Sequence, residues 1–254
     1  MRVALLADVH ANLPALEAVL AELDRRPDID AIYHVGDLVG YAPWPNEVVA
    51  LLEQRGIAGV SGNYDSTVAA DYKHCGCRYQ DARQERLSHI SYDWTRTFTS
   101  PATKRVLGAL PFRLDVRSTG GHLAGPKLIL VHGTPVLNTV YWTEDRPDSF
   151  CCEMAALVGA RSGDLLAFGH THIPWQRVVD GVHFVNAGSV GRPKDADWRA
   201  CVALIDFAPD RTSAVEFLRV AYDVARAAAG IIERGLPSEF ADHLHSGGQS
   251  VPVS

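Results

Sequence analysis

The stretch Val3-Ala4-Leu5-Leu6-Ala7-Asp8-Val9-His10 decides the fold, because a short apolar run leads directly into two side chains that can bind a metal ion. An uninterrupted apolar run predicts a strand that is buried on both faces. In α/β proteins, sites are built beyond the carboxyl ends of the strands. Asp8 and His10 stand at that end, so we expect a buried strand with a functional site at its edge.

The residues that follow alternate between helix and strand signals. Asn12 can cap a helix that carries Pro14 in its first turn, and residues 31–35 form the next apolar run. Residues 45–54 indicate a second helix, and residues 57–60 indicate a third strand. Three strands that alternate with two helices predict parallel βαβ units joined by right-handed crossovers.

The rest of the chain is rich in strand signals after a helical interruption. Residues 66–111 are polar and aromatic, and they predict a helical or irregular insertion that flanks the site. Further strands are expected at 112–116, 128–131, 165–168, 175–179, 182–185, 201–207 and 214–219, with helices at 148–158 and 223–234. We therefore expect an α/β fold with two packed mixed β-sheets flanked by helices, in one domain over residues 1–245. A disordered tail is expected at residues 246–254.

Composition narrows the class of protein. The chain has 254 residues, of which 47% are hydrophobic and 21% charged, which is typical of a globular protein with a sizeable core. Its formal net charge of -6 argues against broad binding to nucleic acid. No apolar run reaches about 18 residues, so no membrane span is expected. The five cysteines are irregularly spaced, and the run before Asp8 is too short for a signal peptide, so we expect a cytoplasmic protein without a disulfide framework.

Four more phrases place polar side chains directly after apolar runs. They are Gly36-Asp37, Gly62-Asn63, His132-Gly133 and Gly169-His170-Thr171-His172. Because parallel strands end at the same edge of a sheet, Asp37 and Asn63 can approach the first Asp-x-His pair there. The later histidines can reach the same edge from the second half of the chain.

The donor set selects the class of metal. Four imidazoles, two carboxylates and one amide, without thiolates, suit Mn, Fe, Zn, Co or Ni better than Ca or Mg, which prefer oxygen alone. Seven ligands are too many for one zinc ion, but they fit two ions about 3.5–4 Å apart that share a carboxylate. We therefore expect two divalent transition-metal ions, with Mn or Fe as first candidates and Zn, Ni or Co as alternatives. Such a site would attract a phosphate anion despite the acidic surface.

As a set, these motifs resemble the signature of the calcineurin-like metallophosphoesterase superfamily, which runs Asp-x-His, Gly-Asp, Gly-Asn-His, His and Gly-His-x-His. The resemblance covers residues 1–195, and the phrase Asn186-Ala187-Gly188-Ser189-Val190-Gly191 is most similar to the small bacterial and archaeal phosphodiesterase branch. The resemblance implies that one metal is bound by Asp8, His10, Asp37 and His172. It implies that the other is bound by Asp37, Asn63, His132 and His170, so that Asp37 bridges the two ions.

The resemblance also implies a reaction, in which a metal-bound hydroxide attacks the phosphorus of a phosphate ester. The residues expected at the reacting centre are Asp37, Asn63, Tyr64 and Asp65. The family often carries a histidine after the asparagine to help protonate the leaving oxygen, whereas this chain has Tyr64. A phenol, with an ordinary pKa of about 10, is a weaker general acid than imidazolium. We therefore expect phosphodiesters with good leaving groups to be favoured over alkyl phosphomonoesters.

Contacts to the substrate are expected from Asn12, Asn63 and Arg192. Asn12 also meets the requirements of a helix cap, and Arg192 could equally be a surface residue as a bidentate ligand of phosphate oxygens. The thiols of His74-Cys75-Gly76-Cys77 and Cys151-Cys152 lack the CxxC spacing of zinc ribbons. We therefore expect buried or idle thiols there rather than a third metal site.

Three functions are compatible with the sequence. They are a dimetal phosphodiesterase, a phosphomonoesterase that acts on nucleotides or proteins, and a non-catalytic scaffold of the same fold. Fold alone does not decide function, but a scaffold can lose metal ligands without penalty, and all seven candidates are present here. The expected partner is a small phosphate-ester substrate, and the sequence leaves a homo-oligomer open.

Overall fold

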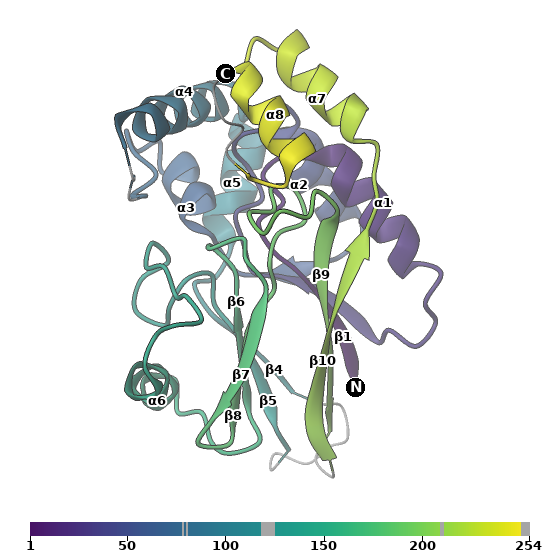
Figure 1. Cartoon of the computed structure of the whole chain (residues 1–254), viewed down its shortest axis with the longest axis vertical. Helices are drawn as coiled ribbons and strands as arrows, with labels where there is room; N and C mark the ends of the chain where they lie inside the picture. Colours follow the sequence, from purple (N-terminus) through teal and green to yellow (C-terminus); the bar gives the residue numbers. More distant parts are fainter. Residues whose placement is uncertain (78, 80, 118–124, 209–210, 250–254) are drawn as a thin grey trace.

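The computed structural model describes residues 1–77, 79, 81–117, 125–208 and 211–249. In this part of the chain, two five-stranded β-sheets pack face to face, and helices cover their outer faces (Figure 1). Both sheets contain parallel and antiparallel pairs. The expected α/β fold with two packed mixed sheets is therefore confirmed.

The first sheet is built on the amino-terminal strand. Its order is β10 (Arg211–Val220), β9 (Ala200–Ala208), β1 (Arg2–Leu6), β2 (Ala31–His34) and β3 (Ala58–Gly59). Strands β1, β2 and β3 run parallel and are joined by helices α1 (Leu13–Leu23) and α2 (Pro45–Gln54), whereas β9 is antiparallel to β1. The predicted βαβ units are present, although β3 is shorter than the run at 57–60 that predicted it.

The second sheet comes from the later half of the chain. Its order is β4 (Leu114–Arg117), β5 (Lys127–Leu130), β6 (Leu165–Phe168), β8 (Val182–Asn186) and β7 (Trp175–Val179). Strands β5, β6 and β8 are parallel, and the antiparallel β4 and β7 form the edges. Asp180 and Gly181, with φ of 47° and 77°, turn the chain between β7 and β8, as a two-residue hairpin requires. Helix α6 (Asp148–Leu157) packs on the outer face of this sheet.

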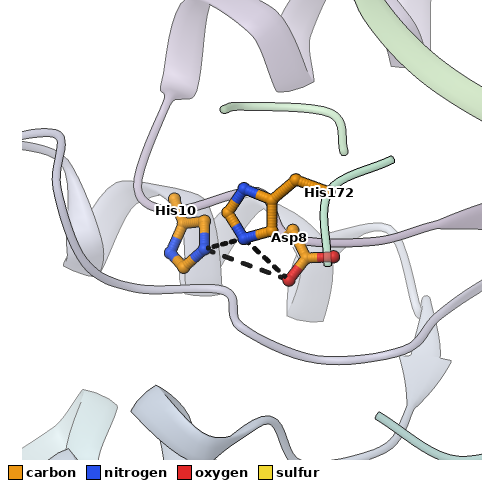
Figure 2. A group of neighbouring side chains, drawn as sticks. All are labelled: Asp8, His10 and His172. Carbon is orange, nitrogen blue, oxygen red and sulfur yellow. Dashed lines mark hydrogen bonds and ion pairs between the residues drawn. The ribbon is translucent and has the colours of Figure 1, made fainter. Parts of the chain in front are cut away.

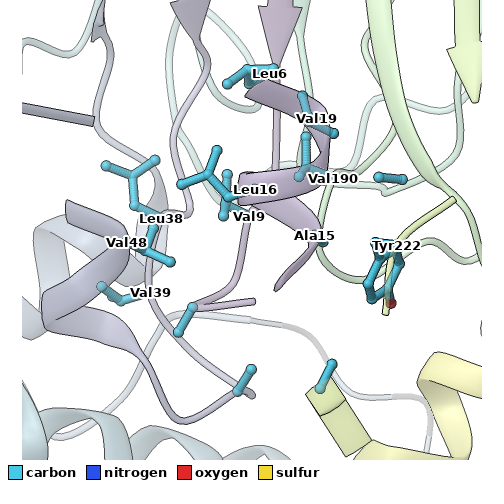
Figure 3. Packing of buried hydrophobic residues seen from close by; sticks show 14 of the residues in the cluster. Leu6, Val9, Ala15, Leu16, Val19, Leu38, Val39, Val48, Val190 and Tyr222 are labelled. Carbon is cyan, nitrogen blue, oxygen red and sulfur yellow. The ribbon is translucent and has the colours of Figure 1, made fainter. Parts of the chain in front are cut away.

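Strand β1 contributes to two cores because its side chains alternate in direction. Val3 and Leu5 are fully buried between the two sheets, in the same cluster as Leu128 of β5. Ala4 and Leu6 are fully buried on the opposite face of the sheet. There they belong to the apolar cluster in which helix α1 packs on the sheet (Figure 3). A strand that is buried on both faces carries no polar alternation, which is why its sequence is continuously apolar.

The middle of the chain is helical, as expected for the insertion at 66–111. It contains α3 (Asn63–Ala69), α4 (Ala82–Phe98) and α5 (Pro101–Ala109). The side chain of Asp81 accepts a hydrogen bond from the N–H of Gln84, and the side chain of Ser100 accepts one from Thr103, so both longer helices begin at a capping residue. No helix within the described residues is long and apolar enough to cross a membrane.

The chain continues into two more helices, α7 (Val224–Glu233) and α8 (Ser238–Ser246). Helix α7 packs against both α8 and α1 (Figure 1). Helix α8 was not predicted from the sequence, whose composition indicated disorder from residue 246. Instead, Ser246 is the last residue of α8, and Gly247 follows with φ of 60° and accepts a hydrogen bond from Ala196. Residues 250–254 lie outside the described part of the chain.

The inter-sheet core predicts a difference between two leucine truncations. Leu128 is fully buried between the sheets, so Leu128→Ala should lower the free energy of unfolding by about 2–5 kcal/mol. Leu157, on α6, is 56% exposed, and Leu157→Ala should change that free energy by less than about 1 kcal/mol. Urea denaturation of both variants measures the two effects, and equal losses would show that the inter-sheet cluster is not the principal core.

Candidate metal centre

The seven candidate ligands lie where strands end at one edge of the molecule's two sheets. Asp8 and His10 follow β1, and Asp37 follows β2. Asn63 begins α3 directly after β3, while His132 follows β5 and the His170–His172 pair follows β6. Each of the seven side chains is at most 4% exposed. The topology thus gathers segments that lie far apart in the sequence.

The backbone of this edge is strained. Five candidate ligands have φ in the left-handed region, namely Asp8 (50°), His10 (48°), Asp37 (51°), His170 (66°) and His172 (62°). Such conformations cost about 1–3 kcal/mol each for a residue with a side chain, and they persist only where surrounding structure enforces them. Here hydrogen bonds between loops do so: the N–H of His10 donates to Asp37 at 3.0 Å, and the N–H of Gly191 donates to the carbonyl of Asp8 at 3.1 Å.

Asp8, His10 and His172 form the first cluster (Figure 2). The Nε2 atoms of His10 and His172 are 3.0 Å apart. The Oδ1 atom of Asp8 lies 3.4 Å from Nε2 of His172 and 3.9 Å from Nε2 of His10. The other oxygen of Asp8 accepts a hydrogen bond from the N–H of His170 at 2.9 Å. Three donor atoms therefore converge, and the carboxylate that carries one of them is fixed by the backbone.

Asp37, His132 and His170 form the second cluster, and Asn63 lies beside it. Nε2 of His132 is 3.2 Å from Nδ1 of His170 and 3.2 Å from Oδ1 of Asn63. Oδ2 of Asp37 is 3.4 Å from the same Nε2 atom. The amide of Asn63 thus presents its oxygen to the cluster, as a metal ligand would.

Asp37 joins the two clusters. Its Oδ2 atom lies 3.4 Å from Nε2 of His132 in one cluster and 3.7 Å from Nε2 of His10 in the other. Its Oδ1 atom accepts a hydrogen bond from the N–H of Tyr64 at 2.9 Å. A Cβ at Gly62 would stand 2.1 Å from that Oδ1 atom, so the close approach requires glycine. The position of Asp37 is the one that a bridging carboxylate needs.

Backbone carbonyls orient three of the imidazoles. His10 donates from Nδ1 to Val39, His132 donates from Nδ1 to Val35, and His172 donates from Nδ1 to Arg192, at 3.0, 2.7 and 2.6 Å. With a proton on Nδ1, the Nε2 atom of each ring faces the clusters and is the atom that can offer a lone pair to a metal ion. The lone pairs of His10 and His172, 3.0 Å apart, repel each other unless a cation lies near both. The donor set therefore fits a bound metal ion in each cluster.

Burial governs protonation in this centre. It lowers the pKa of His10 to about 3 and that of His172 well below its ordinary value, so both imidazoles are neutral at pH 7. Burial raises the pKa of Asp8 to about 8. Burial also opposes a charge on His132, but the carboxylate of Asp37 outweighs it and raises the pKa of His132 to about 9. Metal binding would therefore release protons from Asp8 and His132.

Two residues expected at the reacting centre or the substrate are used by the fold instead. The amide of Asn12 is fully buried; it caps α1 through Ala15 and donates to the carbonyl of Gly191 at 2.9 Å. The geometry therefore assigns Asn12 to the helix cap, and it offers no free group to a substrate. Both oxygens of the buried Asp65 accept backbone hydrogen bonds, from Leu38 at 2.8 Å and from Gly62 at 2.9 Å. Asp65 thus ties the loop after β2 to the start of α3.

Tyr64 lies behind the first cluster. Its ring is 1% exposed and packs edge-on against His10 at 5.5 Å, with Tyr41 at 5.3 Å and Tyr92 at 5.7 Å. Burial, together with the neighbouring Tyr41, raises the pKa of the Tyr64 hydroxyl well above its ordinary value. The phenol consequently stays protonated throughout the neutral range.

Two cationic side chains, Arg192 and Lys194, form a cationic rim beside the clusters. The guanidinium of Arg192 stands 4.0 Å above the ring of Tyr41. Lys194, two residues later, has a pKa lowered to about 8 by burial and by Arg192, while Asp8 and Asp37 oppose that shift. Its ammonium therefore lies within the electrostatic reach of both carboxylates. Arg192 was predicted from the sequence, whereas Lys194 was not, because its only signal was its place on the same segment.

The two cysteine pairs have different surroundings. Cys75 and Cys77 lie beside Asn63, which donates from Nδ2 to the carbonyl of Cys75 at 3.0 Å and to Sγ of Cys77 at 3.3 Å. In contrast, Sγ of Cys151 accepts a hydrogen bond from Arg177 on β7. Neither pair belongs to a cluster of three metal-ligating side chains among the residues that the structure describes.

Known proteins are similar to this chain over nearly its whole length. The chain is 28% identical over 264 residues to the uncharacterized protein MJ0912 of Methanocaldococcus jannaschii, covering 96% of this chain and 98% of the other. A metallophosphoesterase from Sphaerobacter thermophilus superposes with a TM-score of 0.73 at 29% identity, covering 97% of this chain and 99% of that chain. The hypothetical protein PH1004 from Pyrococcus horikoshii OT3 shares the fold, with a TM-score of 0.80, 23% identity, and coverage of 98% and 99%.

A family model for the calcineurin-like phosphoesterase superfamily domain matches residues 1–210. That range contains every motif that carries the sequence resemblance, from Asp8 to His172. The two Asp/His clusters formed by these motifs fit a dinuclear metal centre. The chain therefore belongs to the calcineurin-like phosphoesterase superfamily.

Proposed function

We propose that this protein is a dimetal phosphodiesterase. The observation that carries the proposal is the pair of buried Asp/His clusters joined by the Oδ2 atom of Asp37. Asp8, His10, Asp37 and His172 would hold one ion, and Asp37, Asn63, His132 and His170 the other. When bound, two divalent cations supply a nucleophile from water at neutral pH and neutralise charge on the phosphoryl oxygens. Manganese and iron are the first candidates, because the donors mix imidazole nitrogen with carboxylate and amide oxygen.

The chain's own groups would orient the ions and the substrate. The backbone hydrogen bonds to Nδ1 of His10, His132 and His172 hold each ring with Nε2 directed inward. The rigid placement of ligands matters because catalysis by electrostatic stabilisation requires dipoles and charges that do not reorganise during the reaction. The strained loops described above provide that rigidity.

Arg192 and Lys194 are the groups best placed to bind phosphate oxygens beside the metals. Arg192 is oriented by the ring of Tyr41 and could contact an anion bidentately. Lys194 approaches the same centre closely enough to sense Asp8 and Asp37. Two local cations would reinforce the attraction of a phosphate ester to a protein whose net charge is negative.

The diester assignment follows the resemblance to the phosphodiesterase branch, and the expected preference for good leaving groups rests on Tyr64. A phenol whose pKa is raised by burial is a poor source of protons for a leaving alkoxide. Esters with less basic leaving groups need no such proton. This reasoning favours activated or aryl phosphodiesters over alkyl phosphomonoesters, and a phosphomonoesterase is the alternative. A non-catalytic scaffold is disfavoured because seven buried ligands converge at a cost in strain and desolvation.

The two clusters predict metal stoichiometry. Full-length protein reconstituted with Mn²⁺ should contain nearly two equivalents by elemental analysis. His172→Ala should lose one of them and Asp37→Ala most of both, because Asp37 contributes to both clusters. His89→Ala is a matched control, since His89 lies on α4 outside both clusters. A wild-type content of one equivalent or less would contradict the dinuclear centre.

The substrate preference predicts a ratio of rates. With the Mn²⁺-reconstituted protein, kcat/KM for a bis-aryl phosphate should exceed that for the corresponding mono-aryl phosphate. The comparison isolates the ester class, because the leaving group is the same in both substrates. If the monoester is preferred by about tenfold or more, a barrier difference of about 1.4 kcal/mol, the phosphomonoesterase alternative replaces the proposal.

Replacing Tyr64 tests the missing general acid. Tyr64→His should accelerate hydrolysis of esters with basic alkyl leaving groups, within a range of about 10²–10⁴-fold that is typical of general acid catalysis. Nitrophenyl esters should be nearly unaffected, because their leaving oxygen needs no proton. Metal content measured in parallel serves as the control, since the substitution keeps the backbone N–H through which Tyr64 donates to Asp37. An equal change for all substrates, or a loss of metal, would mean that the ring of Tyr64 shapes the centre instead.

A further inference from the structure

The thiols of Cys75 and Cys77 touch each other next to a candidate metal ligand. Their Sγ atoms are 2.7 Å apart, and both cysteines are free. A disulfide bond is about 2.05 Å long, so only a small movement separates the pair from a covalent bond. Gly76 between them has φ of 75°, a left-handed conformation that lets the chain turn back on itself.

The same two residues hold the amide of Asn63. Its Nδ2 atom donates to the carbonyl of Cys75 at 3.0 Å and to Sγ of Cys77 at 3.3 Å. Those two hydrogen bonds leave Oδ1 of Asn63 directed at the second cluster, 3.2 Å from Nε2 of His132. The state of the Cys77 sulfur is therefore coupled to the orientation of a metal ligand.

We infer that Cys75 and Cys77 are a reversible oxidation site whose disulfide weakens metal binding in the second cluster. Peroxide would oxidise one of the two thiols to a sulfenic acid, with release of one water molecule. The other thiol would then attack that sulfur and displace its hydroxyl group, forming the disulfide and a second water molecule. In total, the two thiols lose two electrons and two protons, and one molecule of hydrogen peroxide is reduced to two molecules of water.

The disulfide changes what Asn63 contacts. We expect closing the bond to shift Sγ of Cys77 and so to break its 3.3 Å contact with Nδ2 of Asn63. The amide of Asn63 then has the carbonyl of Cys75 as its one remaining partner of the two, and it can rotate more freely. Its Oδ1 atom is therefore no longer held against the cluster. Loss of a partner that orients a metal ligand typically lowers metal affinity by about 10–100-fold. The effect on catalysis rests on the proposed phosphoesterase function, whereas the thiol chemistry and the metal affinity do not.

The test uses metal-free, full-length protein treated with hydrogen peroxide. Thiol titration and peptide mass mapping should show loss of two of the five thiols, both within the peptide that contains Cys75 and Cys77. Calorimetric titration with Mn²⁺ should then show one of two sites weakened by about 10-fold or more, and a phosphine reductant should restore it. Absence of this disulfide, or unchanged Mn²⁺ affinity once it has formed, would overturn the inference.

Serine variants separate the disulfide from other oxidation. In Cys77→Ser, the serine oxygen can still accept a hydrogen bond from Asn63, but residue 77 can no longer form a disulfide with Cys75. Peroxide should therefore not change the Mn²⁺ affinity of this variant. Cys75→Ser provides a second variant if the first folds poorly. Cys152→Ser, outside the centre, should respond to peroxide like the wild type. A peroxide response that persists in both Cys75→Ser and Cys77→Ser would overturn the inference.

Protein that binds two metals and responds to peroxide as expected, yet hydrolyses no phosphate ester, would refute the proposed function alone.

Discussion

The carboxylate of Asp37 is the group on which the centre depends, because it is buried among imidazoles and shared by two clusters. A buried carboxylate is strongly disfavoured unless hydrogen bonds and opposite charges replace its hydration. Here the N–H of Tyr64 binds one oxygen, while the other faces His132 and His10. The start of α3 can reach Asp37 only because Gly62 lacks a side chain. The loop after β2, the turn into α3 and the second sheet are therefore positioned relative to one carboxylate.

Strain and rigidity have the same origin in this structure. The left-handed backbone of Asp8, His10 and His172 directs adjacent side chains toward one point, which an extended strand cannot do because its side chains alternate. The conformations are enforced from both sides: Val190 and Gly191 donate to the backbone carbonyls at the end of β1, and the segment after β2 accepts from the loop at His10. The packed sheets beneath supply the stability that offsets this local strain.

The sequence predicted those parts of the structure that depend on local pattern and topology. Strands β6 and β7 match the expected ranges, and the candidate ligands converge because parallel strands end at one edge. The cap role of Asn12 was predicted from its place before the helix, and Ala15 accordingly donates to its side chain. The bond from Asn12 to Gly191 and the bond from Leu38 to Asp65 were not predictable, because only the folded chain brings these partners near. Helix α8 was missed for a related reason. Its apolar face is short, and its stability comes from tertiary packing rather than from its own propensity.

Helix α8 also contacts residues that lie beside the metal clusters. The family model ends at residue 210, yet α8 lies beyond it and contacts the rim of the metal site. Phe240 packs edge-on against Tyr41 at 5.4 Å, and Tyr41 in turn supports Arg192. His243 donates to the carbonyl of Pro193 at 3.0 Å, which anchors the segment that carries Arg192 and Lys194. The metal ligands thus come from the part of the chain shared with the superfamily. Arg192 and Lys194, the proposed phosphate-binding side chains, lie on a segment that a carboxy-terminal helix outside that part anchors.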